Sequence, residues 1–473
     1  MMAKQGIRAP LRVLLITPSL PAASGLEVAE GRAISALMQD LLEHQGGFAV
    51  TNVSTLPADL ESFRNQARTL LVQPELRRQG DDLDLSYRFV WGRQIPSGAP
   101  VPWVVHRAEW LPPAKAWAAF LTSFPQRVQG SQGNLVPKSA KVFWELIRAG
   151  AWRLQNQHLD QALALAAQGT VREPDCASGW ILLGNLRYRC LLNNAMASRR
   201  EQADTEAALQ RGLALAPNHP RGVLLLSLLR SDIGNQREAL DLLLRARRKQ
   251  PFNPSLLTGI AYAARNAGLL PLARRAMDIR DSLAFAKLQP QAVDITCLYT
   301  GEISRFEASL QEQPGHLRSA SGVLTFYRGY LALIQGHRSQ AHREFRAAAA
   351  LENGYPNILR LSEIYDLILE DRKDEAWKRL REYDQERTGM REPDGEFTIR
   401  LAEAYALIGD RASAMDMASR AFGRGFGCTD WYERSPMLEP LRSLPKWKAL
   451  IQHLKERQAL MEDRFPVGLL EEN

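Results

Sequence analysis

Apolar and small residues recur along the central part of the chain at the spacing of paired amphipathic helices. The clearest stretch lies within residues 217–287, where equivalent positions are 34 residues apart. These pairs are Pro217 and Pro251, Pro220 and Pro254, Gly234 and Gly268, and Ala239 and Ala273. A period of this length, with a Gly between two amphipathic stretches and a Pro after the second, predicts stacked helix-turn-helix units that bury their apolar faces only against each other.

The residue types at the repeated positions have a physical reason. Small side chains allow the two helices of a unit, and neighbouring units, to approach closely. Gly supplies the turn between the helices. Pro220 and Pro254 fit the first turn of a helix, where the missing N–H removes no hydrogen bond.

The same pattern extends in both directions from the clearest units. Upstream, it predicts a unit at 143–176 and a second at 177–217, which is longer than the usual period by an insertion near 191–200. The units at 220–253 and 254–287 are regular, and a degenerate unit follows at 288–321. The pattern then returns at these positions: Gly329, Gly336, Ala341, Phe345, Ala348, Tyr365, Ala376, Leu380, Ala402, Tyr405, Gly409, Ala414 and Ala421.

The Trp, Leu-Gly, Ala, Phe and Pro positions of these units, beginning at Trp180 and Leu183-Gly184, resemble those of the tetratricopeptide repeat (TPR) family over residues 140–430. The resemblance implies an α solenoid whose concave groove, lined by the first helix of each unit, binds an extended peptide or a partner helix. In this register the groove-lining residues, and therefore the expected partner-binding residues, are Asn185, Arg189, Arg221, Tyr262, Arg265 and Asn266. Alternatively, Arg221 and Arg265 would only solvate the helix surface. The Asn and Lys pairs with which some TPR proteins clamp a terminal carboxylate are not reproduced.

Residues 431–473 depart from the repeat. Pro445 is placed where a helix can begin, and an apolar stripe follows it, made of Trp447, Leu450, Ile451, Leu454 and Leu460. A terminal helix with a polar outer face covers the exposed end of an array. We therefore expect C-terminal capping helices and a tail.

The part of the chain before the array reads as a small α/β domain at 11–125, preceded by a flexible terminus at 1–10 and followed by a linker at 126–139. Strands are predicted at Leu11–Thr17, Phe48–Val53, Thr69–Gln73, Leu83–Trp91 and Val101–His106, with helices at Leu26–His44 and Ala58–Ala67. Alternation of strands and helices followed by adjoining strands predicts a mixed sheet. The fold class is therefore an α+β N-terminal domain followed by an all-α superhelical solenoid.

The opening Leu11–Pro18 and the block from Leu70 through Arg78-Gln79-Gly80-Asp81 to Trp91 resemble the TolB-amino-terminal-like or FlgO-like α/β domain. That domain precedes TPR arrays in bacterial regulators, including CadC-type activators and cyclase- or kinase-associated proteins. The resemblance implies a regulatory, signalling or scaffold role in a bacterium. The chain lacks the winged-helix, kinase or cyclase sequence that would name a pathway.

The net charge of +8 is unevenly distributed. Residues 131–290 hold 22 basic and 12 acidic side chains, a surplus of ten, whereas the parts before and after are nearly balanced. A basic surface attracts nucleic acid or acidic proteins, but Arg-rich helices are often simply solvated. The apolar run at Leu11–Ile16 is too short for a signal peptide or a membrane span. The four scattered cysteines suggest reduced thiols, so we expect a cytoplasmic protein.

Chemical motifs are sparse in the sequence. It contains no P-loop, HExxH, GxSxG or paired-Cys signature, so no catalytic residue, metal or cofactor is predicted. Gly423, Gly425 and Gly427 follow a predicted helix rather than a strand, which favours a helix exit over a phosphate loop. Cys428 is expected to be a packed thiol, and the acidic group at 81–84 is expected to be solvated rather than a cation site.

Three functions therefore compete. The leading interpretation is a non-enzymatic scaffold with protein or peptide partners. The alternative is a nucleic-acid-binding protein that uses residues 131–290, although its aromatic and basic residues are not interleaved as stacking requires. The third is a nucleotide-handling N-terminal domain, for which the loop at 19–25, with a single Gly, is a poor phosphate cradle. The sequence leaves the partner and the oligomeric state open.

Overall fold

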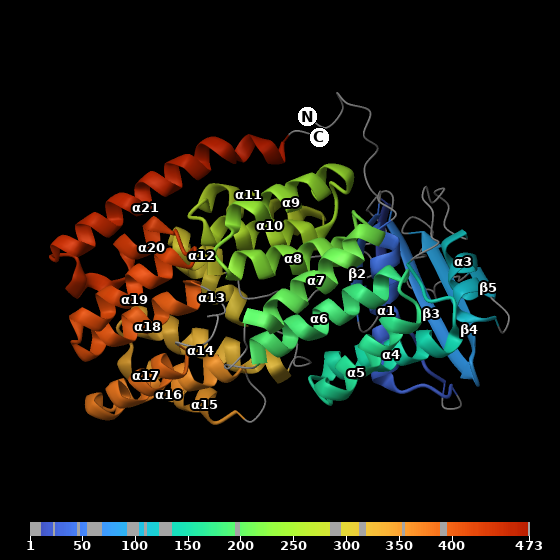
Figure 1. The fold of residues 1–473 in the computed structure, drawn as a ribbon, viewed down its shortest axis with the longest axis horizontal. Helices are drawn as coiled ribbons and strands as arrows, with labels where there is room; N and C mark the ends of the chain where they lie inside the picture. Colours follow the sequence, from blue (N-terminus) through green and yellow to red (C-terminus); the bar gives the residue numbers. More distant parts are fainter. Residues whose placement is uncertain are drawn as a thin grey trace, which may run out of the picture.

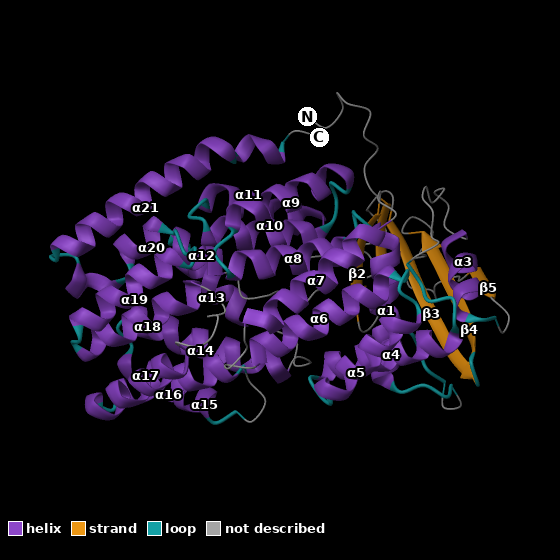
Figure 2. Ribbon diagram, in the orientation of Figure 1, coloured by secondary structure: helices purple, strands orange, loops and turns teal. Residues whose placement is uncertain are grey.

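The computed structural model describes residues 11–21, 24–44, 48–53, 69–91, 104–107, 111–122, 135–193, 199–283, 295–311, 318–351, 355–387 and 395–471. It contains an α+β N-terminal domain followed by an all-α array of helix pairs (Figures 1 and 2). The predicted fold class is confirmed. The predicted flexible terminus at 1–10 and the predicted helix at 58–67 lie outside the described residues.

The N-terminal sheet has five described strands in the order β2-β1-β3-β4-β5. They are β1 (Leu11–Ile16), β2 (Phe48–Val53), β3 (Thr69–Gln79), β4 (Asp82–Trp91) and β5 (Val104–Arg107). The β1 strand pairs in parallel with β2 and β3, whereas β4 pairs antiparallel with β3 on one side and β5 on the other. Gly80, with φ of 58°, makes the tight turn between β3 and β4 at the predicted place.

Two described helices pack on this sheet. The α1 helix (Val28–His44) packs against β1 and β2, and α3 (Pro113–Thr122), which the sequence pattern did not predict, packs against β4. In α3, Trp117 and Phe120 are buried and meet edge to face with centroids 6.0 Å apart. Trp117 also lies 6.3 Å from the ring of Phe143 in the array. The α/β domain and the start of the array therefore share one core.

The described part of the array contains eight helix pairs. In chain order they are α4 (Ala140–Gln155) with α5 (Leu159–Arg172), α6 (Ala177–Asn193) with α7 (Arg199–Leu215), α8 (Pro220–Asp232) with α9 (Gln236–Lys249), α10 (Pro254–Asn266) with α11 (Leu270–Leu283), α12 (Ile295–Thr300) with α13 (Ile303–Gln311), α14 (Arg318–Ile334) with α15 (Arg338–Ala349), α16 (Pro356–Leu369) with α17 (Lys373–Arg387), and α18 (Gly395–Ile408) with α19 (Arg411–Gly423).

The turns inside the pairs explain the repeated glycines. Five of the described pairs turn at a Gly in the left-handed region, namely Gly234, Gly268, Gly301, Gly336 and Gly409, with φ between 78° and 101°. Residues with a Cβ atom adopt this conformation at a cost. Two other pairs turn instead through Asn156 and Asp371, with φ of 54° and 60°. Short polar side chains of this kind tolerate the left-handed region better than most.

The irregular units have simple structural counterparts. The insertion predicted near 191–200 coincides with the end of α6 and the start of α7, each 17 residues long, and residues 194–198 of it lie outside the described part. In the stretch predicted as degenerate, the structure places the short helices α12 and α13, of 6 and 9 residues. Of the predicted linker at 126–139, only residues 135–139 are described.

The end of the chain folds back along the array. After α20 (Thr429–Arg434) and the 3-10 helix η2 (Pro436–Leu441), the long α21 (Pro445–Arg464) leads to η3 (Val467–Leu470) beside α9 and α11 (Figure 1). Arg464 pairs with Asp241 of α9 at 2.8 Å. In the predicted apolar stripe Trp447, Leu450 and Leu454 are buried. Leu460 does not belong to this stripe, because 74% of it is exposed.

The second half of the array also packs against the first. The exit from α19 lies on the turns of two earlier units, so a Cβ atom at Gly234 would lie 3.2 Å from the carbonyl oxygen of Arg424. The N–H of Gly427 donates to the carbonyl of Asn266 at 2.7 Å. The glycines at 423–427 are thus a helix exit, as predicted. Gly is required at position 425, where φ is 99° and a Cβ atom would lie 2.6 Å from the Cα of Gly234.

Candidate ligand-binding site at the domain junction

A pocket lies where the α/β domain meets the array. It is lined by α1 on one side and by α4, α6 and the start of α8 on the other. Since α4, α6 and α8 are the first helices of three consecutive units, the pocket is part of the face predicted to be the groove. The cavity has a volume of about 80 Å³. Several non-hydrogen atoms of a ligand would fit.

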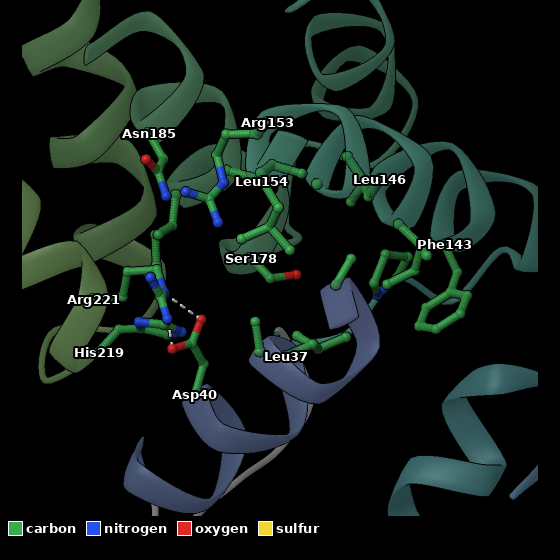
Figure 3. A pocket seen from close by; sticks show the side chains of 17 residues that line it. Leu37, Asp40, Phe143, Leu146, Arg153, Leu154, Ser178, Asn185, His219 and Arg221 are labelled. Atoms are coloured by element: carbon green, nitrogen blue, oxygen red, sulfur yellow. Dashed lines mark hydrogen bonds and ion pairs between the residues drawn. The ribbon is translucent and has the colours of Figure 1, made fainter. Parts of the chain in front are cut away.

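The two ends of the pocket differ in chemistry (Figure 3). Asp40, Asn185, His219, Arg221 and the guanidinium of Arg153 gather at one end. Apolar side chains line the middle and the other end, among them Ala33, Ala36, Leu37, Phe143, Leu146, Ile147, Ile181 and Leu182. The arrangement suits a molecule with an apolar body and a polar head.

Asp40 is fully engaged at the polar end. The Nε atom of Arg221 donates to both of its carboxylate oxygens, at 2.9 and 2.7 Å. This carboxylate raises the pKa of Arg221 above its ordinary value. Burial lowers the pKa of His219 to about 4, so the imidazole is neutral at physiological pH.

Arg153 is the cation of the pocket without a carboxylate partner. Among the described residues, its guanidinium makes neither a hydrogen bond nor an ion pair. Burial, and then the nearby Arg221 and Arg189, lower its pKa to about 10, so it still carries its charge at neutral pH. The polar end therefore has a net positive charge that an anion would neutralise.

Below the pocket, the end of α1 makes a second polar contact with the array. The buried Glu43 accepts from Asn253 Nδ2 at 3.0 Å and from Gln39 Nε2 at 2.7 Å. Burial raises the pKa of Glu43 to about 7. The rings of His44 and His219 lie 5.7 Å apart, and burial lowers the pKa of His44 as well. The junction thus contains one carboxyl group, that of Glu43, whose pKa lies near neutrality.

Of the six residues predicted to line a partner groove, Asn185 and Arg221 line this pocket. Arg189 lies near its polar end, where its guanidinium donates to Asn156 at 3.1 Å and stacks on Tyr355 with 5.0 Å to the ring centroid. A role for these three residues in partner binding stays a prediction. To bind a partner, Arg221 would have to break its ion pair with Asp40.

Of the other three predicted residues, the side chain of Arg265 contacts the second half of the array, whereas those of Tyr262 and Asn266 are hydrogen-bonded within the first half. Arg265 forms a bidentate ion pair with Glu396 of α18, at 3.1 and 2.9 Å, and both side chains are buried. Tyr262 donates to Asp232 at 2.8 Å, and the amide of Asn266 donates to the backbone carbonyl of Tyr262 at 3.0 Å. Binding of a partner by these residues also stays a prediction, and for Arg265 it would require that its ion pair with Glu396 opens.

The interior of the second half holds a buried charged network. Arg400 lies over the rings of Tyr330 and Trp431, at 4.3 and 5.2 Å, and pairs with Glu403 at 3.2 Å. Burial raises the pKa of Tyr330 well above its ordinary value. All of these side chains are buried and contact one another, so we assign the network to folding.

Sites of other chemistry are poorly supported among the described residues. Cys428 is fully buried, and burial raises the pKa of its thiol to about 12; the prediction of a packed thiol is confirmed. One group has ligand atoms close enough for a metal, namely His342, Asp366 and Glu370. Arg346 already pairs with both of its carboxylates, which opposes a cation there.

Part of the basic surplus of residues 131–290 is neutralised by carboxylates elsewhere in the chain. Five of its arginines form ion pairs with carboxylates outside that region: Arg148 with Glu30, Arg221 with Asp40, Arg265 with Glu396, Arg274 with Glu302, and Arg275 with Glu471. The charge that looks excessive along the sequence is thus partly neutralised in space.

Comparisons with known proteins give little beyond the fold. No protein-family model matches the chain, and no curated protein matches it. Among solved structures, the TPR domain of P58(IPK) is similar, at 14% identity and a TM-score of 0.21, over 69% of this chain and 99% of that one. With so low a TM-score we draw nothing further from the alignment. No described helix is long and apolar enough to cross a membrane. The helix pairs and their left-handed turns form an all-α solenoid.

Proposed function

We propose that this protein is a non-enzymatic regulatory scaffold of a bacterial cell, and that the junction pocket controls its binding to protein partners. One observation carries the proposal: α1 of the α/β domain and the first helices of three repeat units together line a single pocket. A ligand there contacts both domains, so its binding is linked to their relative stability.

The solenoid supports the scaffold role, because arrays of helix pairs act by binding. The concave face already holds protein segments through Arg–carboxylate pairs, Arg221 with Asp40 and Arg265 with Glu396. A partner with an acidic helix would use the same chemistry. The resemblance of the N-terminal domain to those of CadC-type regulators supports the bacterial and regulatory parts of the proposal, and a cytoplasmic location is part of it.

The alternative function, nucleic-acid binding through residues 131–290, is less favoured. The pairing of five arginines with outside carboxylates reduces the positive charge that phosphates would meet. A gel-shift experiment at low salt distinguishes the two. A shift that disappears as salt rises supports the alternative.

Partner capture from the native host tests the scaffold proposal. The tagged full chain is compared with Ala36→Phe, whose ring fills the pocket, and with Val171→Phe, which adds the same ring to a residue of α5 that is 81% exposed. We expect specific proteins with the wild type and with Val171→Phe, and a changed set or amount with Ala36→Phe. Identical partners for all three chains contradict control by the pocket, and no specific partner contradicts the scaffold.

A further inference from the structure

We propose that the junction pocket binds a small carboxylic acid with an unbranched apolar chain, whose carboxylate pairs with Arg153. This inference deepens the proposed function, since it names the ligand of the pocket, but it does not depend on a protein being the partner. Its starting point is the chemical contrast between the two ends of the pocket (Figure 3).

The net positive charge at the polar end of the pocket favours an anionic ligand. Arg221 is neutralised by Asp40 at 2.7 Å, and His219 is fully enclosed by its neighbours. Arg153 remains as a cation in a partly buried position, with no carboxylate among the described residues bonded to it. A partly buried guanidinium gains more from a paired carboxylate than an exposed one, because water competes less.

A carboxylate fits this end better than a phosphate. The planar guanidinium of Arg153 can donate two parallel hydrogen bonds to a carboxylate. The described lining contains no cluster of glycine N–H groups that would bind additional phosphate oxygens. Asn185, at the same end, offers an amide that can donate to the head group.

The apolar lining of the rest of the pocket favours an apolar chain on the ligand. Leu37 of α1 lies opposite Leu146 and Phe143 of α4, with Leu154 near the mouth (Figure 3). Sugars and nucleobases would leave hydroxyls or amides unpaired against these side chains, which is costly. An alkyl chain instead leaves water and gains contact area.

The ligand would also couple the two domains. Its chain would touch α1 and α4 together, and its carboxylate would be held by Arg153 of α4 beside Arg221 of α8. Because the ligand binds the docked arrangement and not the separated one, it would raise the stability of the junction in proportion to its concentration.

Calorimetric titration of the purified full chain tests the inference. The probes are butanoate, hexanoate and octanoate, with octylamine and 1-octanol as the cationic and neutral matches to octanoate. We expect the affinity to rise about fourfold for each methylene that enters the pocket, with octylamine not binding. Equal binding of octanoate and octylamine, or no binding of any carboxylate, would overturn the inference.

Variants separate binding from folding. Arg153→Gln should weaken octanoate binding at least tenfold and leave 1-octanol binding unchanged. Arg153→Lys should weaken octanoate binding less than Arg153→Gln, because it keeps the charge but loses the two parallel hydrogen bonds. Ala36→Phe should abolish binding, and Val171→Phe should not. Unchanged unfolding midpoints show that each variant is folded. Wild-type octanoate affinity in Arg153→Gln contradicts the assigned role. Because this titration uses no partner protein, its failure leaves the scaffold proposal standing, and the reverse also holds.

Discussion

Replacement of Arg265 by Gln tests whether the two halves of the array are joined in the way that the structure shows. The guanidinium of Arg265 on α10 donates two hydrogen bonds to Glu396 on α18, at 3.1 and 2.9 Å. Tyr299 donates a third to the same carboxylate at 2.6 Å. Burial alone would raise the pKa of Glu396, but Arg265, Tyr299 and Arg400 together outweigh burial and hold the pKa below its ordinary value. The carboxylate is therefore charged, buried and dependent on Arg265.

The size of the effect follows from what the substitution leaves behind. Removing one partner of a buried ion pair costs about 3–5 kcal/mol, because the remaining charge is buried without compensation. Tyr299 still donates to Glu396, so we expect a value near the lower end, about 3 kcal/mol. The double variant Arg265→Gln/Glu396→Gln leaves no unpaired charge at this position. Its free energy of unfolding should therefore lie close to that of the wild type.

Urea unfolding followed by far-UV circular dichroism measures these differences, and limited proteolysis locates them. Lys378→Gln is the control, because Lys378 and Glu382 are 4.0 Å apart with side chains 74% and 45% exposed. Such a surface pair contributes at most about 1 kcal/mol. The reasoning is refuted if Arg265→Gln is no less stable than Lys378→Gln, or if the double variant is less stable than Arg265→Gln alone.

Two further predictions concern the junction and the turns. Glu43 has its pKa raised from 4.5 to about 7, so its contribution to stability is fully present below pH 4.5 and is lost as the pH rises from 4.5 through 7. Between these two pH values the unfolding midpoint of Glu43→Gln should decline less than that of the wild type, and an equal decline contradicts the assignment. His219 has the opposite sign, since its pKa is lowered to about 4, but it is present in both chains, so the difference between wild type and Glu43→Gln reports on Glu43. Gly268→Ala should destabilise the chain more than Gly336→Ala, because both have φ near 80° but only at Gly268 would the new Cβ collide with the Gly427 carbonyl; equal urea midpoints for the two variants would show that the packing is absent.

The local features of the array could be predicted from the sequence. The 34-residue spacing that links Gly234 to Gly268 located two helix pairs and their turns, because a left-handed turn requires Gly whatever lies around it. The exit of α19 was predictable for the same reason, because Gly425, with φ of 99°, adopts the left-handed region there. Such signals depend on the backbone within a few residues, and the sequence contains them directly.

Contacts between distant parts of the chain could not be predicted. An Arg on the inward face of a repeat helix looks the same whether it faces a partner or, like Arg265, a Glu 131 residues later. Arg153 was missed because its importance comes from α1 and α6 closing around it. The α3 helix was missed because Pro113–Thr122 is short and its apolar side chains give no clear period.

The return of the chain onto itself changes what the repeats can do. In an open solenoid each unit contacts only its neighbours, and stability is a sum of local terms. Here Arg265 is paired with Glu396, and Asp241 with Arg464 of α21. Units in the first half are thus held by elements about 130 and 220 residues later. Substitutions on the inward face then change the stability of both halves together, and loss of a partner after such a substitution does not identify a contact residue. The junction pocket is different, because Ala36 and Arg153 line it without bonding the two halves together, so variants there report on binding itself.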